Sequence, residues 1–179
     1  MSTSHTGSPT MKSERCHAAI LIVLIGTATL SGCRTPDPAA ELKPVLDRYI
    51  EIWNTGNLQG VEQILHPEFE LRMTPEFEPE TGIELLKESI AKYRTAYPDF
   101  HIDVDELFFA QDVAAARWTI TATHSGPGWI PPTGKTVKVP GISIFHFEEG
   151  KLKDEWVAGN NGYWLDQIGF TLVPPSPQQ

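Results

Sequence analysis

His124 has both the residue type and the neighbours that proton transfer requires. It ends a predicted strand on which Trp118 and Ile120 share its side-chain parity, and a Pro/Gly-rich loop follows it. An imidazole in that position can donate to a substrate carbonyl or exchange a proton near neutral pH. The alternative is a half-buried structural histidine whose ring nitrogens are satisfied by the protein.

Large aromatic side chains are predicted to form a pocket wall around this histidine. A wall of aromatic residues with few polar groups suits a flat or lipophilic small molecule. The candidate wall residues are Tyr93, Tyr97, Trp118, Phe145, Trp156 and Trp164. Each one alone is equally compatible with core packing, but the set favours a ligand pocket. Asn54, at the end of the first predicted helix, is either a ligand contact or a helix C-cap.

The other histidines do not predict a metal site. His66, His101 and His146 are not placed at metal-ligand spacing with His124, and no cysteine assists them. We expect no metal.

Three helices are predicted before the long strands. Apolar residues recur at helical spacing over residues 39–53, with Asp37 and Pro38 as the cap and the first position. A short helix is expected over residues 58–65. A third helix, over residues 83–97, begins at a capping box that starts at Thr81 and ends before Pro98.

Alternating apolar residues after Pro98 predict an antiparallel meander. The expected strands cover residues 100–109, 113–124, 136–147 and 151–159, and a brief strand precedes them at residues 69–73. Pro140 and Gly141 interrupt the third long strand and predict a bulge or bend there. Helices followed by such a meander define an α+β fold.

Several motifs carry a family resemblance. They are YIEIWNTGN from Tyr49, the Pro98-Asp99 pair, and the run from Gly126 to Trp156 with PPTGK, VPGISIF, an EGK turn and an acidic-x-Trp end. In this order, over about residues 42–169, they resemble the SnoaL-like polyketide cyclase or ester cyclase group of the nuclear transport factor 2-like superfamily. The resemblance implies a cone-shaped fold with three N-terminal helices packed on a strongly curved antiparallel sheet.

The resemblance also implies a chemistry. Such cyclases close a ring by an intramolecular aldol step, using a pocket carboxylate as acid and base and no cofactor. In relatives, an Asp commonly stands four positions after the Trp of the last strand, where this chain has Asn160. An amide can hold an enolate oxygen but does not shuttle a proton. Asp154, which matches the family's acidic position and shares strand parity with Trp156, is therefore the candidate carboxylate, or else a surface charge.

Three functions stay open on these grounds. The first is a cofactor-independent cyclase, isomerase or lyase acting on a small hydrophobic carbonyl compound, in which Asp154 and His124 share proton transfer and Asn54 or Asn160 holds the oxygen. The second is a non-catalytic envelope lipoprotein that binds a hydrophobic small molecule. The third is an interaction domain that forms a homodimer through the outer face of the sheet.

The N-terminal segment predicts export. A basic stretch after Met11 is followed by 13 apolar or small residues, too few to span a bilayer, and then by Leu-Ser-Gly-Cys, which resembles a bacterial lipobox. We therefore expect a signal peptide over residues 1–33, lipid on Cys33, a linker at 34–40, one domain at 41–170, a frayed tail at 171–179 and a location in the cell envelope. An ordinary cleaved signal or an uncleaved anchor are the alternatives.

The charge balance limits the partners. The chain has a formal net charge of −9, which disfavours nucleic acid and anionic lipid because phosphate contacts need clustered Lys and Arg. Membrane contact is therefore expected only through the lipid anchor.

Overall fold

The computed structural model describes residues 37–73, 79–171 and 173. The predicted signal segment with Cys33, the first part of the linker and most of the tail lie outside the described residues. The described elements are α1 (Pro38–Thr55), α2 (Val61–Ile64), β1 (Leu65–Met73), β2 (Glu80–Thr81), α3 (Ile83–Ala96), β3 (His101–Ala110), β4 (Val113–Thr123), β5 (Thr136–Glu148), β6 (Lys151–Gly159) and α4 (Asn161–Ile168). Among the described residues, no helix is long and apolar enough to cross a membrane.

Local sequence signals place the first helix as predicted. The Asp37 side chain accepts a hydrogen bond from the Ala39 amide at 3.1 Å, and Pro38 occupies the first turn, where a missing N–H costs nothing. Gly56 ends α1 in the left-handed conformation. The predicted capping box of α3 is wrong: Gly82 precedes that helix without a side-chain cap, because Thr81 is engaged in β2, where it pairs with Glu70.

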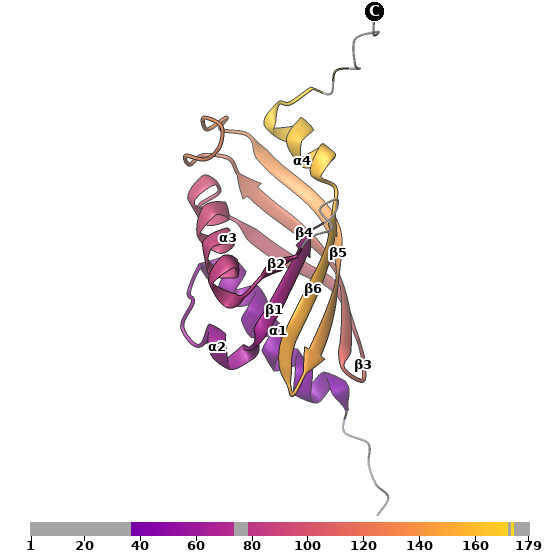
Figure 1. The fold of residues 1–179 in the computed structure, drawn as a ribbon. Helices are drawn as coiled ribbons and strands as arrows, with labels where there is room; N and C mark the ends of the chain where they lie inside the picture. Colours follow the sequence, from indigo (N-terminus) through magenta and orange to yellow (C-terminus); the bar gives the residue numbers. More distant parts are fainter. Residues whose placement is uncertain (1–36, 74–78, 172, 174–179) are drawn as a thin grey trace, which may run out of the picture. The chain divides into compact units, whose positions relative to one another are not determined.

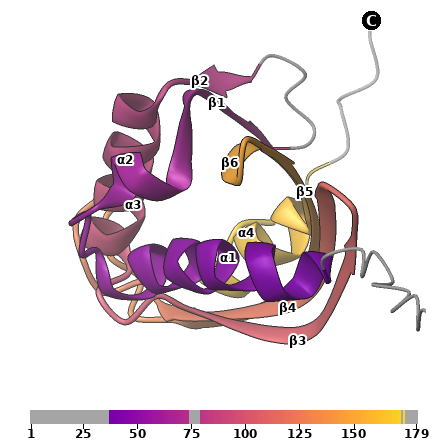
Figure 2. The ribbon, with the colours of Figure 1, turned by 90° about the horizontal axis from the view of Figure 1, so that it is seen from below.

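The strands form one mixed sheet in the order β2-β1-β6-β5-β4-β3 (Figure 1). The four long strands make the expected antiparallel meander, but β1 pairs with β6 in parallel. The predicted wholly antiparallel sheet is therefore corrected at one pair, whereas the α+β class is confirmed. The sheet curls around α1, which lies in its concavity (Figure 2).

The bend predicted at Pro140 and Gly141 is not a bulge. Strand β5 pairs with β4 from Thr136 to His146 without a register shift. Gly141 serves close packing instead, because a Cβ atom there would lie 2.0 Å from a ring carbon of Trp118. The register shifts in the meander occur in the β3–β4 pairing, between Val104 and Glu106, and in the β5–β6 pairing beside His146.

Side-chain alternation separates the two faces of the sheet. On β4, the predicted inward parity is confirmed, with Trp118, Ala122 and, just after the strand, His124 all buried. On β5, Ser143 and Phe145 are buried while their neighbours are exposed. The core thus lies between the concave face of the sheet and helices α1 and α3.

Candidate functional site

A cavity of about 600 Å³ opens between the concave face of the sheet and helices α1, α3 and α4. Aromatic side chains make up much of its wall. They are Tyr49, Trp53, Tyr93, Tyr97, Phe100, Trp118, Trp129 and Trp164. A cavity of this size and lining fits a small, flat, largely apolar molecule.

One acid projects into this aromatic cavity. Glu155, on β6, lines the cavity, is 7% exposed, and is the only buried carboxylic acid among the described residues. Tyr49 Oη–H donates to its Oε2 at 2.6 Å, and Ser143 Oγ–H donates to its Oε1 at 2.7 Å. Trp118 Nε1–H in turn donates to Ser143 Oγ at 2.9 Å. Donors from α1, β4 and β5 therefore fix the carboxyl group of Glu155.

Burial changes the proton affinity of this group. Desolvation raises the pKa of Glu155 above its ordinary value of 4.5, and the hydrogen bonds from Tyr49 and Ser143 only partly offset it. Burial, followed by the nearby Glu155 charge, likewise raises the pKa of Tyr49. A raised pKa makes the carboxylate of Glu155 a stronger base than that of an exposed glutamate, and the acid form can return the proton.

Glu155 faces inward because β6 pairs with β5 through a bulge. Phe147 pairs with Leu152, but His146 pairs with Asp154, so Lys153 has no partner on β5. A bulge of this kind reverses the alternation beyond it. The sequence-based parity, counted without the bulge, therefore assigned β6 to the wrong faces from Asp154 onward.

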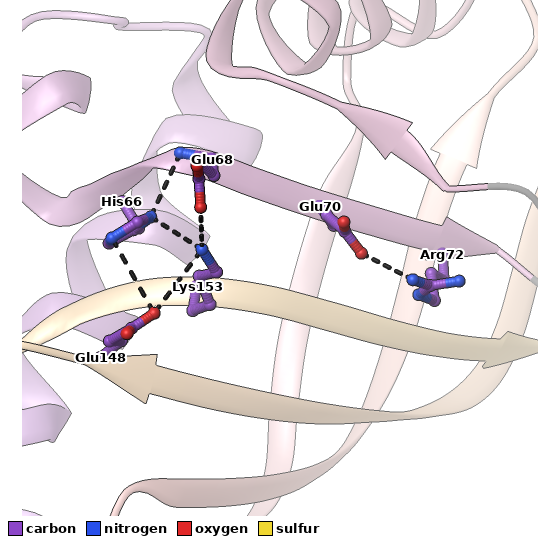
Figure 3. A network of polar contacts seen from close by, with 6 residues as sticks. All are labelled: His66, Glu68, Glu70, Arg72, Glu148 and Lys153. Carbon is purple, nitrogen blue, oxygen red and sulfur yellow. Dashed lines mark hydrogen bonds and ion pairs between the residues drawn. The ribbon is translucent and has the colours of Figure 1, made fainter.

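Ionic contacts surround the bulge residue (Figure 3). Lys153 Nζ lies 2.8 Å from Glu68 Oε2, 3.5 Å from Glu148 Oε2 and 3.1 Å from His66 Nδ1. The ammonium group of Lys153 therefore lies among polar side chains of β1 and β5.

Asp154 and Trp156, predicted to face the pocket, lie on the outer face of the sheet. Asp154 contacts His146 Nδ1 at 2.7 Å, and Trp156 is 47% exposed with the Arg72 guanidinium 5.8 Å from its ring. Neither lines the cavity. The reversed alternation after Lys153 is the physical reason for this correction.

The side chains of the two predicted asparagines form hydrogen bonds with the backbone. Asn160 is the N-cap of α4, where its side chain accepts from the Tyr163 amide at 2.9 Å. Asn54 neither lines the cavity nor caps α1, because it exchanges two hydrogen bonds with the backbone of Ile102, at 2.7 and 3.1 Å. It therefore fastens α1 to β3.

His124 packs against Tyr97, a residue of the cavity wall. It is 1% exposed, its Nδ1 accepts from the Thr133 amide at 3.3 Å, and its ring packs on Tyr97 with centroids 5.0 Å apart. It does not line the cavity. Of the predicted wall residues, Tyr93, Tyr97, Trp118 and Trp164 do line it, whereas Phe145 is fully buried against Tyr49.

Sequence reasoning missed Glu155 and its partner Tyr49. The available signal was the three-residue spacing between Leu152 and Glu155, which only a bulge makes compatible with burial of both. For Tyr49, the signal was its place on the apolar stripe of α1. No group of three potential metal ligands occurs in the described parts of the chain.

A curved sheet closed by helices over an apolar cavity is the architecture of nuclear transport factor 2-like proteins. The family model of SnoaL-like polyketide cyclases matches residues 43–168, so this chain belongs to that family. It is 28% identical over 108 residues to aklanonic acid methyl ester cyclase AcmA of Streptomyces galilaeus, covering 59% of this chain and 74% of AcmA.

Solved structures agree with this assignment. TsrD from Streptomyces laurentii is 27% identical with a TM-score of 0.65, and the match covers 73% of this chain and 96% of TsrD. IdmH from Streptomyces antibioticus, at 20% identity and a TM-score of 0.63, covers 72% of this chain and 98% of IdmH, and shows the fold alone. The homologues support a function of the cyclase or isomerase type.

Proposed function

We propose that this protein catalyses a cofactor-independent acid–base reaction, a cyclisation or isomerisation, on a small hydrophobic carbonyl compound, with Glu155 as the proton-transfer group. The observation that carries the proposal is the single buried carboxyl group of the described cavity, held by Tyr49 and Ser143 within an aromatic wall. The name of AcmA, which assigns cyclisation of a methyl ester to that relative, supports it.

For an intramolecular aldol closure, the steps balance without any further reagent. The Glu155 carboxylate accepts a proton from a carbon next to a carbonyl, and the enolate carbon bonds to a second carbonyl carbon of the same molecule. The resulting alkoxide then takes the proton back from the Glu155 carboxylic acid. One group can serve in both steps because the raised pKa makes its carboxylate a better proton acceptor, and the carboxylic acid formed in the first step is the proton donor in the last.

The surrounding residues hold this carboxyl group in place. Each carboxylate oxygen accepts one protein hydrogen bond and keeps one lone pair for the substrate. A substrate that fills the cavity displaces water from this group, which strengthens the interactions of developing charge with these fixed donors.

The test compares neighbouring acids on opposite faces of one strand. Glu155→Gln should lower the turnover of a panel of β-keto esters and enones by about 100-fold or more, in the range that a general acid–base residue contributes. Asp154→Asn is the matched control and should retain full turnover, because Asp154 lies outside the cavity. Equal losses in both variants, or full turnover in Glu155→Gln, would overturn the assignment.

A non-catalytic binding module is the second candidate function. The observation in its favour is the wall of eight aromatic side chains, a lining suited to retaining a lipophilic ligand. If wild type takes up a lipophilic probe, followed by its tryptophan fluorescence, but turns over no member of the panel, this candidate replaces the catalytic one.

We also propose that the domain is exported and anchored to the cell envelope through lipid on Cys33, as the lipobox-like sequence predicts. Cys33→Ser should move the protein out of the membrane fraction or leave the precursor uncut. Wild-type protein with an unmodified N-terminal residue in the soluble fraction would contradict the anchor.

A further inference from the structure

The cavity wall contains a second hydrogen-bonding side chain, Tyr97, which comes from the end of a helix and not from the sheet. Tyr97 follows directly after α3 and lines the cavity together with Trp164 of α4. Trp164 Nε1–H donates to Tyr97 Oη at 2.9 Å. The oxygen of the Tyr97 hydroxyl group therefore already accepts a hydrogen bond from another wall residue.

The ring that carries this hydroxyl is held on two sides. Trp164 packs edge-on against it at 5.2 Å and 87°, and His124 packs against it at 5.0 Å and 33°. Thr133 in turn fixes His124. Tyr97 is only 6% exposed, so its Oη has a defined position in the wall.

The proton of this hydroxyl has no acceptor among the described residues. Tyr49 differs, because its hydroxyl group donates a hydrogen bond to Glu155. Burial also raises the pKa of Tyr97, which keeps the group a donor at ordinary pH. When a ligand fills the cavity and expels water, this O–H loses its remaining partners unless the ligand supplies an acceptor, and an unpaired buried donor costs about 1–3 kcal/mol.

We propose that Tyr97 is a specificity-determining residue that donates a hydrogen bond to a second oxygen acceptor of the substrate. The substrate class is then an apolar, flat compound with two separated oxygen functions, one placed at Glu155 and Tyr49 and the other at Tyr97. The inference rests on the proposed function for the first of these contacts. A compound lacking the second acceptor leaves Tyr97 unpaired and binds more weakly.

The experiment uses pairs of naphthyl β-keto esters that differ only at the far ring edge. One member carries an acetyl group at ring position 5, 6 or 7, and its partner carries an isopropyl group of similar shape. Binding is followed by tryptophan fluorescence in wild type, in Tyr97→Phe and in Tyr163→Phe, a control on an exposed tyrosine outside the cavity.

Wild type and Tyr163→Phe should prefer the acetyl compound by about tenfold at one or more ring positions, as one hydrogen bond of about 1.4 kcal/mol implies. Tyr97→Phe should lose that preference while binding the isopropyl compound as before. Where turnover is detected, the change should appear in KM and leave kcat nearly constant. Equal preference in wild type and Tyr97→Phe, or none in wild type at any position, would overturn the proposal.

The design separates this inference from the proposed function. The same binding series, repeated in a Glu155→Gln background, requires no turnover. Loss of the acetyl preference on Tyr97→Phe in that background supports the role of Tyr97 even if no β-keto ester is converted.

Discussion

Asp154 and Glu155 are adjacent acids on β6 with opposite environments. Asp154 lies on the outer face beside His146, at 2.7 Å, and its side chain is 25% exposed. Glu155 lies in the aromatic cavity with Tyr49 and Ser143 as donors and is 7% exposed. The two side chains carry the same carboxyl group, so the difference in their surroundings comes from the fold.

The difference teaches that one β-bulge can decide which side chains of a strand face a cavity. If β6 kept all of its residues but paired with β5 without the bulge at Lys153, regular alternation would turn Asp154 and Trp156 toward the cavity and Glu155 outward.

The largest effect is expected from added volume on the inner face. Gly141→Ala places a methyl group where Trp118 ring carbons lie within 2.0 to 2.5 Å, so the ring that donates to Ser143 must move. We expect a loss of about 3 kcal/mol in the free energy of unfolding, at the upper end for overpacking. Urea denaturation measures it. Pro140→Ala, at the neighbouring exposed position, is the control and should lose less than half as much.

The next effect concerns pH. Because burial raises the pKa of Glu155, the folded state binds a proton more tightly than the unfolded chain. Its stabilising contribution is complete below pH 4.5 and is lost as pH rises through the folded-state pKa. Urea midpoints from pH 4 to 8 should therefore fall more steeply in wild type than in Glu155→Gln. Parallel profiles would show that Glu155 does not titrate differently in the fold.

A smaller effect is expected from removing the bulge. Deleting Lys153 leaves Leu152 next to Asp154, so the pairing on both sides of the bulge can continue in its present register with Glu155 still facing inward. We expect ligand binding to be retained and the unfolding midpoint to fall slightly, since the contacts with Glu68 and Glu148 are lost. Inserting one Ala after Asp154 instead should abolish binding, because it reverses the parity of Glu155. If the deletion also abolished binding, the alternation argument would be wrong.

The smallest effect is expected at the cap of α4. Asp and Asn are equivalent N-caps, and a carboxylate is favourable at a helix N-terminus. Asn160→Asp should therefore change the free energy of unfolding by less than about 0.5 kcal/mol and leave turnover unaltered. A marked gain in turnover would place Asn160 in the site after all.

Local patterns in the sequence were sufficient for most of the fold. The periodicity of α1 and the alternation of β4 predicted their buried faces, because helix and strand periods hold wherever the backbone is regular. The parallel pairing of β1 with β6 was not predictable, since the partners are far apart in sequence and β1 has little pattern of its own.

The site was harder to predict than the fold. Four wall aromatics were predicted because large apolar side chains near the concave face tend to line it, but the acid expected to face the cavity was Asp154, one residue before the acid that does so. A bulge at Lys153 leaves no local mark beyond the spacing of Leu152 and Glu155, and the capping role of Asn160 depends on where α4 begins.

The position of β6 between β1 and β5 has a consequence for the order of folding. Tyr49 and Glu155 are 106 residues apart in sequence, and β1 has no partner on its β6 edge until β6 has been inserted. The cavity also needs α4, which follows β6. Because loop-closure entropy must be overcome before such distant contacts form, we expect the cavity to be completed late in folding. We therefore also expect β1 to keep an edge open to pairing with other chains during synthesis, until β6 and α4 have emerged.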